Sequence, residues 1–221
     1  MPRRTSVRAS TLAFVALVAC SNAVEPGISD SSIQVANATN APIDVWIDGR
    51  RWALGLSMNS LSYSFGVTAG SHRVRIGDPV AGMTELIVEA AQWQSQTIVA
   101  YPTNVASSGP AIAVLTDTTS LMQNGKSLLR VVNLARSAGS FELRYSQPGS
   151  TSTAPILTSS SNNTTSPYVL GDPGVWEVWI TRPGTEAKVL STGPIEIPNI
   201  GFRTVLLLDS PGGPRFVVIA T

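Results

Sequence analysis

The sequence predicts an all-β protein in which two tandem β-sandwich domains follow a leader segment and a flexible tether. Short apolar segments recur about every ten residues and are separated by turn residues, which is typical of a sandwich. Helical periodicity is nearly absent. The pattern of segments then starts again after roughly 95 residues, a period that corresponds to one small domain rather than to a solenoid repeat.

The first domain is expected over residues 33–118. Its clearest strand is Ile43–Ile47, in which apolar residues on one face alternate with Asp44 and Trp46 on the other. A further alternating segment places Tyr63 on the inward face. The segments expected to be strands in this domain are Ile33–Val35, Ile43–Ile47, Leu61–Val67, His72–Ile76, Thr84–Val88, Gln96–Tyr101 and Ala111–Thr116.

The second domain is expected over residues 127–221, after a linker at residues 119–126. The best helical candidate in the chain, Thr119–Asn124, falls in this linker. Both domains are expected to be immunoglobulin-like or transthyretin-like sandwiches. The segments that repeat the strands of the first domain are Leu128–Asn133, Phe141–Tyr145, Val175–Ile180, Thr185–Leu190, Phe202–Leu208 and Arg215–Ala220.

Residues 1–19 have the features of a secretory signal peptide. The first eight residues carry three arginines and no acid, and Ala9–Ala19 is apolar apart from two hydroxyl residues. An uncleaved transmembrane anchor is the alternative, but the apolar run is shorter than the roughly 20 residues that span a bilayer. Residues 20–32 hold the cysteine that ends the leader and then a polar tether, which would reach roughly 40 Å when extended.

The leader ends in Leu17-Val18-Ala19-Cys20, which resembles the lipobox of bacterial lipoproteins. The resemblance implies that the Cys20 sulfur receives diacylglycerol, that the chain is cleaved before Cys20, and that acyl chains such as palmitate anchor the protein in the membrane. Cys20 is the only cysteine, so no intramolecular disulfide is possible. Ordinary secretory cleavage with an idle cysteine is the alternative. By resemblance to enteric sorting rules, Ser21 after the cysteine favours the outer membrane.

The first domain resembles the bacterial DUF4397 domain. Residues 33–49 match its opening, a strand followed by an Ala-Pro corner and an Asp-Val-x-x-Asp-Gly sequence, and residues 65–76 and 84–101 match its next two blocks. A second, degenerate copy is expected in the second domain, where Ser137-Ala138-Gly139 replaces the corner and Glu142 replaces the first aspartate. Asn37 and Asn133 stand in place of a histidine that is usual in the family. The resemblance implies an extracytoplasmic β-sandwich, often tandem and often in lipoproteins, with no known reaction.

The second domain carries a segment of low complexity between Gln147 and Ser166. It is rich in Ser, Thr, Asn, Gly and Pro, a composition that buries too little apolar surface to order itself. A loop of this length is either functional or disordered, and the composition favours disorder.

Candidate catalytic and metal-binding residues are few. His72 is the only histidine, which excludes a histidine-based metal cluster, and it is expected to be a solvated strand residue. Asp44 and Asp48 share a strand face, but two carboxylates fall short of the oxygens that calcium takes, and Asp48 is expected to form a turn with Gly49. No cofactor, metal site or catalytic constellation is therefore expected, and we predict that the protein is not an enzyme.

The charge balance argues against nucleic acid as a partner. The chain has 15 basic and 14 acidic residues, and three of the basic ones lie in the leader, which leaves the mature chain slightly acidic. Nucleic-acid-binding domains are in general strongly basic.

The tryptophans are the candidates for ligand binding. Trp46 and Trp52, the latter expected in a loop, could bind sugars or a protein together with Asp44. Trp176 and Trp179 have opposite strand parity, so both cannot enter one core. The alternative is that these rings pack between the sandwiches or seal a sandwich edge. The fifth, Trp93, is expected to be a turn residue that covers the rim of the core.

Two functions from different classes follow from the sequence. The first is a non-catalytic, lipid-anchored protein of the cell envelope that displays two interaction modules for contacts with another envelope protein. The alternative is a carbohydrate-binding surface lipoprotein that uses exposed tryptophans.

Overall fold

The fold was analysed in a computed structural model. It describes residues 30–103, 109–117, 121, 123–146, 155–159 and 163–220. The leader, the lipobox Leu17–Cys20 and most of the tether therefore lie outside the described residues, as does half of the helical candidate Thr119–Asn124. In the described part of the chain, no helix has the length and apolar character needed to cross a membrane.

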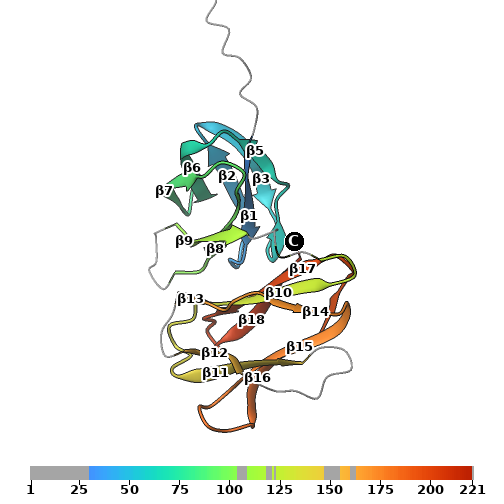
Figure 1. The fold of residues 1–221 in the computed structure, drawn as a ribbon. Helices are drawn as coiled ribbons and strands as arrows, with labels where there is room; N and C mark the ends of the chain where they lie inside the picture. Colours follow the sequence, from blue (N-terminus) through green and yellow to red (C-terminus); the bar gives the residue numbers. More distant parts are fainter. Residues whose placement is uncertain are drawn as a thin grey trace, which may run out of the picture.

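The first half of the chain forms sandwich 1 from two sheets (Figure 1). Inner sheet 1 has the order β4-β1-β8-β9, with β5 also paired to β1, and outer sheet 1 has the order β3-β2-β6-β7. The strands are β1 (Ser31–Asn37), β2 (Ile43–Ile47), β3 (Arg50–Leu56), β4 (Ser60–Leu61), β5 (Phe65–Val67), β6 (Gly70–Asp78), β7 (Gly82–Ala90), β8 (Ser95–Tyr101) and β9 (Ala111–Asp117).

The second half forms sandwich 2 with the same plan. Inner sheet 2 has the order β13-β10-β17-β18, with β14 also paired to β10, and outer sheet 2 has the order β12-β11-β15-β16. The strands are β10 (Ser127–Asn133), β11 (Phe141–Ser146), β12 (Pro155–Ser159), β13 (Thr164–Thr165), β14 (Val169–Gly171), β15 (Gly174–Thr181), β16 (Lys188–Ile197), β17 (Phe202–Leu208) and β18 (Arg215–Ala220). The prediction of an all-β protein with sandwich-like domains is confirmed.

The two sandwiches repeat individual hydrogen bonds as well as strand order. Ser62 lies between β4 and β5, which both pair with β1. Its hydroxyl accepts the Val35 N–H at 2.9 Å. Ser166 occupies the same place in sandwich 2 and accepts the Val131 N–H at 2.9 Å. Each of these N–H groups would be buried without a partner if the serine were lost.

A buried asparagine follows the same pattern at the end of the first strand of each sandwich. The side-chain oxygen of Asn37 accepts the N–H of Thr39 at 2.9 Å, and that of Asn133 accepts the N–H of Ala135 at 3.1 Å. Asn37 also donates to the carbonyls of Ala41 and Leu56 at 2.8 Å. These residues stabilise the corner after the first strand.

Each sandwich has its own apolar core between its two sheets. The core of sandwich 1 is built from the alternate, inward residues of its strands, such as Val35, Val45 and Ile76. The core of sandwich 2 is built in the same way around Trp176 and Phe141. The alternation read from the sequence therefore places the cores correctly, because successive strand residues point to opposite faces of a sheet.

A third core joins the two sandwiches. The outward faces of the inner sheets pack together, so that β8, β10 and β17 are buried on both faces. Stacked sheets that bury an aliphatic layer form a stable contact. The residues of this core are Ala36, Ala38, Val99, Leu115, Val132, Leu134, Leu206, Leu208, Val217 and Ile219.

A buried ion pair lies within this interface. Arg130 of β10, only 2% exposed, bonds to the Asp117 carboxylate at the end of β9 and donates to the Thr116 carbonyl at 2.9 Å. Its Nε donates to Thr204 at 2.9 Å, and Asp117 also accepts the hydroxyl of Thr97 at 2.7 Å. Because buried charges are tolerated only when they are paired and hydrogen-bonded, this network fixes how the two inner sheets meet.

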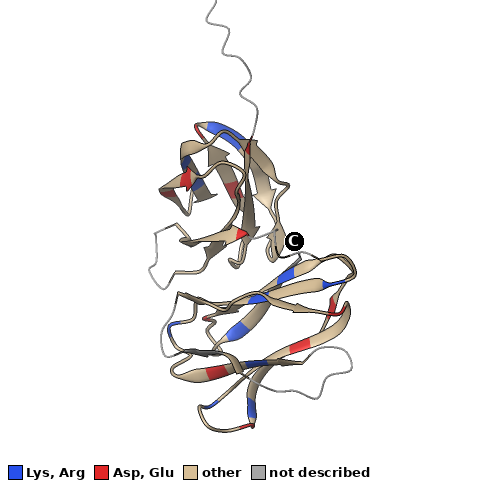
Figure 2. Ribbon diagram, in the orientation of Figure 1, with Lys and Arg blue, Asp and Glu red and all other residues tan. Residues whose placement is uncertain are grey.

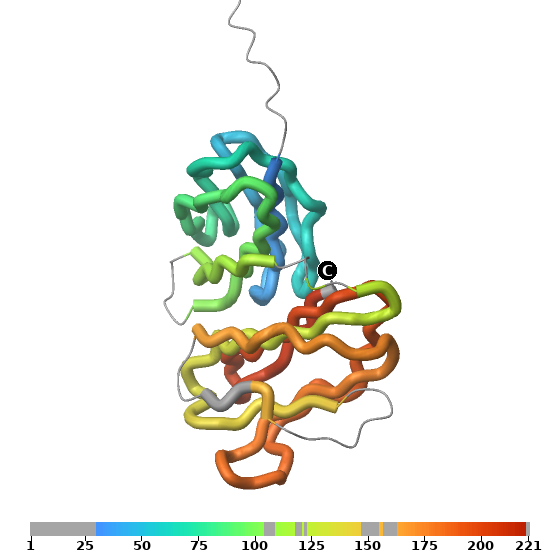
Figure 3. The backbone as a smooth tube through the Cα atoms, in the orientation of Figure 1, coloured from blue at the N-terminus to red at the C-terminus, as the bar shows by residue number. Residues whose placement is uncertain are grey.

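The remaining charges are distributed over the rest of both sandwiches. Lys and Arg are interspersed with Asp and Glu along the ribbon of each half (Figure 2). The chain enters sandwich 1 at Ser31, and β1 runs from the end far from sandwich 2 toward the interface (Figure 3).

Three details of the predicted strands are wrong. The expected strand Leu61–Val67 is split into β4 and β5, and Tyr63 between them is 90% exposed rather than inward. The split arises because Ser62, not Tyr63, turns inward to bond with β1. The expected strand Thr185–Leu190 instead starts at Lys188 and continues to Ile197.

The segment between Gln147 and Ser166 is not a continuous loop. Pro155–Ser159 forms β12 and pairs with β11, and Thr164–Thr165 forms β13 and pairs with β10. The expectation of disorder is therefore wrong for these residues, because both strands pair with neighbouring strands and Ile156 of β12 also packs against the core of sandwich 2. Residues 147–154 and 160–162 lie outside the described part of the chain.

Candidate functional site

His72 is not the solvated residue that the sequence suggested. It lies inward on β6, is 7% exposed, and both ring nitrogens face acceptors. Nδ1 is 2.7 Å from a carboxylate oxygen of Asp48, and Nε2 is 2.7 Å from the carbonyl oxygen of Thr68. Since a carboxylate and a carbonyl both accept, the imidazole donates from both nitrogens and is therefore the protonated, charged form.

The pKa values of this pair shift in opposite directions. Burial acts to lower the pKa of His72, but the hydrogen bonds to Asp48 and Thr68 and the Asp48 charge outweigh it, so the pKa lies above the ordinary 6.5. Burial acts to raise the pKa of Asp48, but the hydrogen bonds from His72 and the Arg73 N–H outweigh it, so the pKa lies below the ordinary 3.8. The pair is a structural ion pair at the turn between β2 and β3.

Asp48 forms the expected turn with Gly49. Both residues have positive φ, 51° and 79°, which fits a tight hairpin turn. Asp44 accepts the Gly55 N–H at 2.7 Å and so helps to hold β3 beside β2. Among the described residues, no three His, Cys, Asp or Glu side chains gather in a way that could hold a metal ion.

Trp46 and Trp52 lie on opposite faces of outer sheet 1. Trp46 points outward on β2, with the Arg75 guanidinium 6.0 Å from its ring centroid. Trp52 packs against the core, its ring centroid 5.1 Å from that of Phe65. The candidate ligand set Trp46, Trp52 and Asp44 is therefore not brought together on one surface.

The position of Trp52 corrects the expectation of a loop. Residues 50–56 form strand β3, which carries register shifts relative to β2. Arg51 pairs with Trp46 and Ala53 pairs with Val45, so Trp52 is the extra residue of a bulge. The bulge turns its ring toward the core, and strict alternation cannot reveal this.

The tryptophans of sandwich 2 follow the parity argument. Trp176 lies in the core and donates its indole N–H to the Asp172 carbonyl at 2.8 Å, whereas Trp179 lies on the other face of β15 with the Lys188 amine 4.3 Å from its ring centroid. Both rings are nonetheless buried. The layer between the sandwiches contains no tryptophan among the described residues, so the hypothesis that these rings pack there is wrong.

Trp93 lies in the turn between β7 and β8, as expected, at a positive φ of 61°. It is 79% exposed, however, and so does not cover the rim of the core. Its backbone N–H donates to the Asp30 carbonyl at 2.7 Å, which ties the turn to the start of β1. The turn geometry, and not apolar burial, sets its position.

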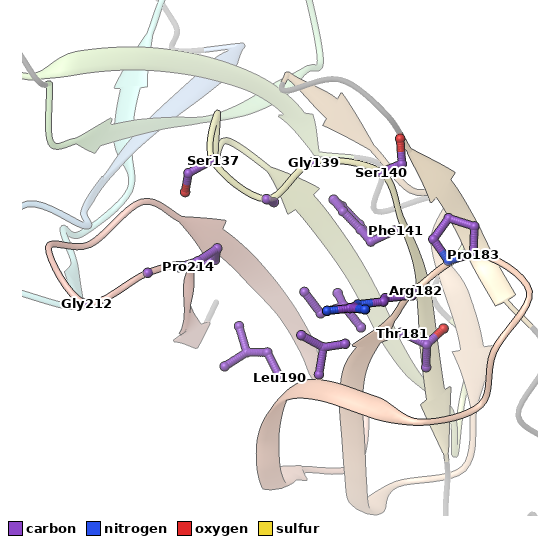
Figure 4. Close-up of a pocket in the computed structure, with 14 residues that line it drawn as sticks. Ser137, Gly139, Ser140, Phe141, Thr181, Arg182, Pro183, Leu190, Gly212 and Pro214 are labelled. Atoms are coloured by element: carbon purple, nitrogen blue, oxygen red, sulfur yellow. The ribbon is translucent and has the colours of Figure 1, made fainter.

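A recess lies at one end of sandwich 2. It has a volume of about 620 Å³ and is formed by the β10–β11 connection, the end of β15, the start of β16 and the β17–β18 turn (Figure 4). Phe141, Ile180 and Leu190 supply apolar walls. A pocket of this size, mostly apolar with a few polar groups, is the usual form of a small-ligand site.

Arg182 is the distinctive residue of this recess. Figure 4 shows its side chain lying between Phe141 and Leu190. It is the one charged side chain among the described residues that line the recess, and it has no hydrogen bond or ion pair with any described residue. Sequence reasoning missed it, because the alternation of Trp176, Val178 and Ile180 continues to Arg182 only where the strand leaves the core.

The equivalent end of sandwich 1 has a smaller and shallower recess, with a volume of about 270 Å³. Gly109 and Pro110, just before β9, lie against β7 at this end, where the Thr84 hydroxyl donates to the Pro110 carbonyl at 2.5 Å. A Cβ on Gly109 would lie 2.4 Å from backbone atoms of Met83 and Thr84, so glycine allows this close approach. Sandwich 2 has the shorter β17–β18 turn at this place.

A second recess of about 460 Å³ lies beside the first, where the two sandwiches meet. Asp209 holds its wall by accepting the backbone N–H groups of Arg136 and Ser137 at 2.9 and 3.0 Å. Burial acts to raise the pKa of Asp209, but these hydrogen bonds and that from the Ser137 hydroxyl outweigh it and lower the pKa. The carboxylate thus uses its oxygens to hold the loop at Arg136 and Ser137, and Ser137 lines both recesses.

Comparison with known proteins identifies one family. No curated protein matches the chain. The sequence profile described as "Domain of unknown function (DUF4397)" matches residues 31–144, which cover sandwich 1 together with β10 and most of β11 of sandwich 2. Because the match spans more than half of the sequence, the chain belongs to the DUF4397 family.

Proposed function

We propose that this chain is a non-catalytic, lipid-anchored protein of the bacterial cell envelope, most simply of the outer membrane, that presents two joined sandwiches to another envelope protein. The observation that carries the proposal is the buried layer between the inner sheets, with the Arg130–Asp117 pair inside it. A fully paired buried charge network and an aliphatic layer resist hinge motion, so the two sandwiches act as one rigid unit.

Sandwich 2 is, in this proposal, a diverged second copy of the DUF4397 domain. The same strand order supports this, as do the repeated hydrogen bonds of Ser62 and Ser166. Divergence leaves the backbone plan in place and changes the open end of the sandwich.

The direction in which the chain enters supports display away from a membrane. β1 begins at the end of sandwich 1 that is far from sandwich 2 (Figure 3). Asp30 is ten residue steps after Cys20, which limits the tether between them to about 33 Å. An anchor on Cys20 therefore places sandwich 1 near the bilayer and sandwich 2 beyond it.

A surface for protein contact is available on the edge of sandwich 1. Leu54 of β3, Met58 of the following turn and Tyr63 before β5 are 69%, 52% and 90% exposed. They come from consecutive segments, and exposed apolar and aromatic side chains are enriched in protein interfaces. The carbohydrate alternative has less support, because Trp52 faces the core and leaves Trp46 without its partner ring.

Membrane fractionation of the Cys20→Ser variant tests the anchor. Two or three acyl chains hold a protein on a membrane almost permanently, so the variant is expected to move from the membrane fraction to the soluble one. Ser21→Ala is the matched control and is expected to stay with the membrane. A Cys20→Ser protein that remains membrane-bound would refute the lipoprotein assignment.

Site-specific photo-crosslinking tests the contact surface. A crosslinker at position 63 is expected to give one discrete adduct in intact cells, and Leu54→Ser is expected to weaken it. A crosslinker at Val80, which is 98% exposed on the β6–β7 turn, serves as the control and is expected to give no adduct. The same adduct from both positions, or none from position 63, would contradict the assignment of this edge.

A further inference from the structure

We propose that the recess at the end of sandwich 2 binds a small ligand that consists of an apolar chain bearing a carboxylate. This site goes beyond the proposed function, because it requires neither the lipid anchor nor a protein partner. It rests on three features of the described structure, which are the apolar walls, the unpaired Arg182 and a recess more than twice as large as the one in sandwich 1.

The apolar walls accommodate the chain of the ligand. Phe141 and Ile180 belong to the buried surface of the sandwich 2 core, and Leu190 packs against it from β16. The recess thus lies against the end of that core, and its accessible apolar surface comes from Val189, which is 59% exposed, and from half-buried Leu190. Its volume of about 620 Å³ lies within the 300–1,000 Å³ that is usual for small-ligand sites. Burial of apolar ligand surface there contributes about 25 cal/mol per Å².

Arg182 selects the carboxylate. Its planar guanidinium can donate two parallel N–H bonds to one carboxylate, and the apolar side chains beside it strengthen that attraction relative to water. No described Asp or Glu lines the recess to compete for it. The Ser140 hydroxyl, also in the lining and also without a partner among the described residues, can supply a further donor.

The charge of the recess favours a monoanion over a phosphate. Arg182 is the single cation in the described lining, and one unit of positive charge matches one carboxylate. The neighbouring Arg136 lies in the second recess, beside the carboxylate of Asp209. A phosphate group would require several converging donors, and the described lining provides one guanidinium.

Sandwich 1 shows what the same place looks like without this site. The residue of β6 that corresponds to Arg182 is Asp78, counted from Gly70 and Gly174 at the strand starts. The Asp78 carboxylate accepts the N–H groups of Val80 and Ala81 at 2.7 and 2.8 Å and so closes its own turn. The recess with a free cation is therefore a feature of sandwich 2 alone within the described chain.

Titration with octanoate and 1-octanol tests the proposal. These probes share an eight-carbon chain and differ in charge, and both are used with the full chain carrying Cys20→Ser, below the concentration at which octanoate forms micelles. Octanoate is expected to bind about three- to tenfold more tightly than 1-octanol, the range for a partly exposed, charge-assisted pair. Backbone amide shifts are expected to change at residues 138–141 and 182–190.

Substitution of Arg182 separates this site from non-specific binding. Arg182→Gln is expected to abolish the preference for octanoate while leaving 1-octanol affinity unchanged, and Arg182→Lys is expected to keep part of the preference. Arg51→Gln, an exposed arginine on sandwich 1, is the matched control and is expected to behave as the parent. Because Arg182 is exposed, its replacement is expected to leave the fold intact, which the amide spectrum verifies.

Two results would overturn the site. One is equal affinity of the parent for octanoate and 1-octanol, or binding of neither. The other is an octanoate preference that survives Arg182→Gln. Neither result bears on membrane anchoring, which the Cys20→Ser fractionation tests separately.

Discussion

The two sandwiches place different residues at the same point of the same backbone. His72 and Trp176 occupy corresponding positions near the starts of β6 and β15. Each directs a ring nitrogen at the carbonyl four residues earlier, His72 at Thr68 over 2.7 Å and Trp176 at Asp172 over 2.8 Å. That carbonyl needs a hydrogen-bond donor at this point of the fold, and an imidazole or an indole N–H can supply it.

The difference lies in what each ring requires in turn. The charged imidazole needs a carboxylate, and Asp48 provides it across the hairpin turn. The neutral indole instead fills the core and stacks on Tyr145 with ring centroids 5.9 Å apart. Sandwich 1 thus relies on a histidine–carboxylate pair at the place where sandwich 2 relies on packing, so protonation near neutral pH is expected to affect sandwich 1 at this place and not sandwich 2.

The largest expected effect concerns the pair that joins the halves. Arg130→Met leaves the Asp117 carboxylate buried without its cation, which is expected to cost about 3–5 kcal/mol. Denaturant unfolding is expected to separate into two transitions, one for each sandwich. The double variant Arg130→Met, Asp117→Leu is expected to recover most of the loss, and a double variant as unstable as the single one would show that the charge pairing is not the cause.

The repeated serines offer a direct comparison of the halves. Ser62→Ala and Ser166→Ala each leave a buried valine N–H without its acceptor, so each is expected to cost about 1–3 kcal/mol. The two costs, from denaturant titration, are expected to agree within error if the sandwiches are structurally equivalent. Ser57→Ala, at an exposed site, is the control and is expected to change stability by less than about 0.5 kcal/mol.

The His72–Asp48 pair predicts a pH dependence confined to sandwich 1. The pKa of His72 is raised above 6.5 in the folded state, so its stabilisation is complete below that pH and is lost as the pH rises through the folded pKa. The pKa of Asp48 is lowered below 3.8, so its contribution is present above that pH and is lost as the pH falls through the folded pKa. Because Asp48 is half exposed, the pair is expected to contribute about 1 kcal/mol.

Hydrogen exchange measured between about pH 5 and pH 9 separates the two halves, since histidine is the side chain that ordinarily titrates in this range. Protection in sandwich 1 is expected to weaken toward the alkaline end, and His72→Gln is expected to remove this trend. Sandwich 2, where Trp176 does not titrate, is the internal control. Equal pH trends in both halves would contradict the role of the pair.

The smallest expected effect concerns two matched turns. Trp93 and Ile200 occupy corresponding positions before β8 and β17, with φ of 61° and 55°. Positive φ is sterically least favourable for a β-branched residue. Ile200→Gly is therefore expected to stabilise the protein by up to about 1 kcal/mol, and Trp93→Gly by less. Val175→Gly is the control, because Val175 lies in strand β15 and its own φ is not positive. This substitution is expected to destabilise the protein by about 0.5–1 kcal/mol in thermal unfolding.

The sequence by itself determined the all-β class and most strand positions. Ile43–Ile47 alternates so cleanly that the predicted and observed strands coincide, because one face packs on the core and the other meets solvent. The second series of strands located β10, β11, β15, β17 and β18 but misplaced the start of β16 and missed β12–β14. Leu128–Asn133 and Phe202–Leu208 carry apolar residues on both faces, which is the pattern of strands covered on both sides and a local signal of the layer between the sandwiches.

Only the tertiary structure decided the remaining features. Strand β3 contains bulges, and β12 is a short strand inside a segment of low complexity, so the local sequence pattern reveals neither and both depend on pairing with a neighbouring strand. His72 and Asp48 are far apart in the chain and meet because β6 pairs with β2. Arg182 becomes a candidate ligand residue only because the loops around it leave the end of sandwich 2 open, and loop packing is a long-range property that no local sequence pattern encodes.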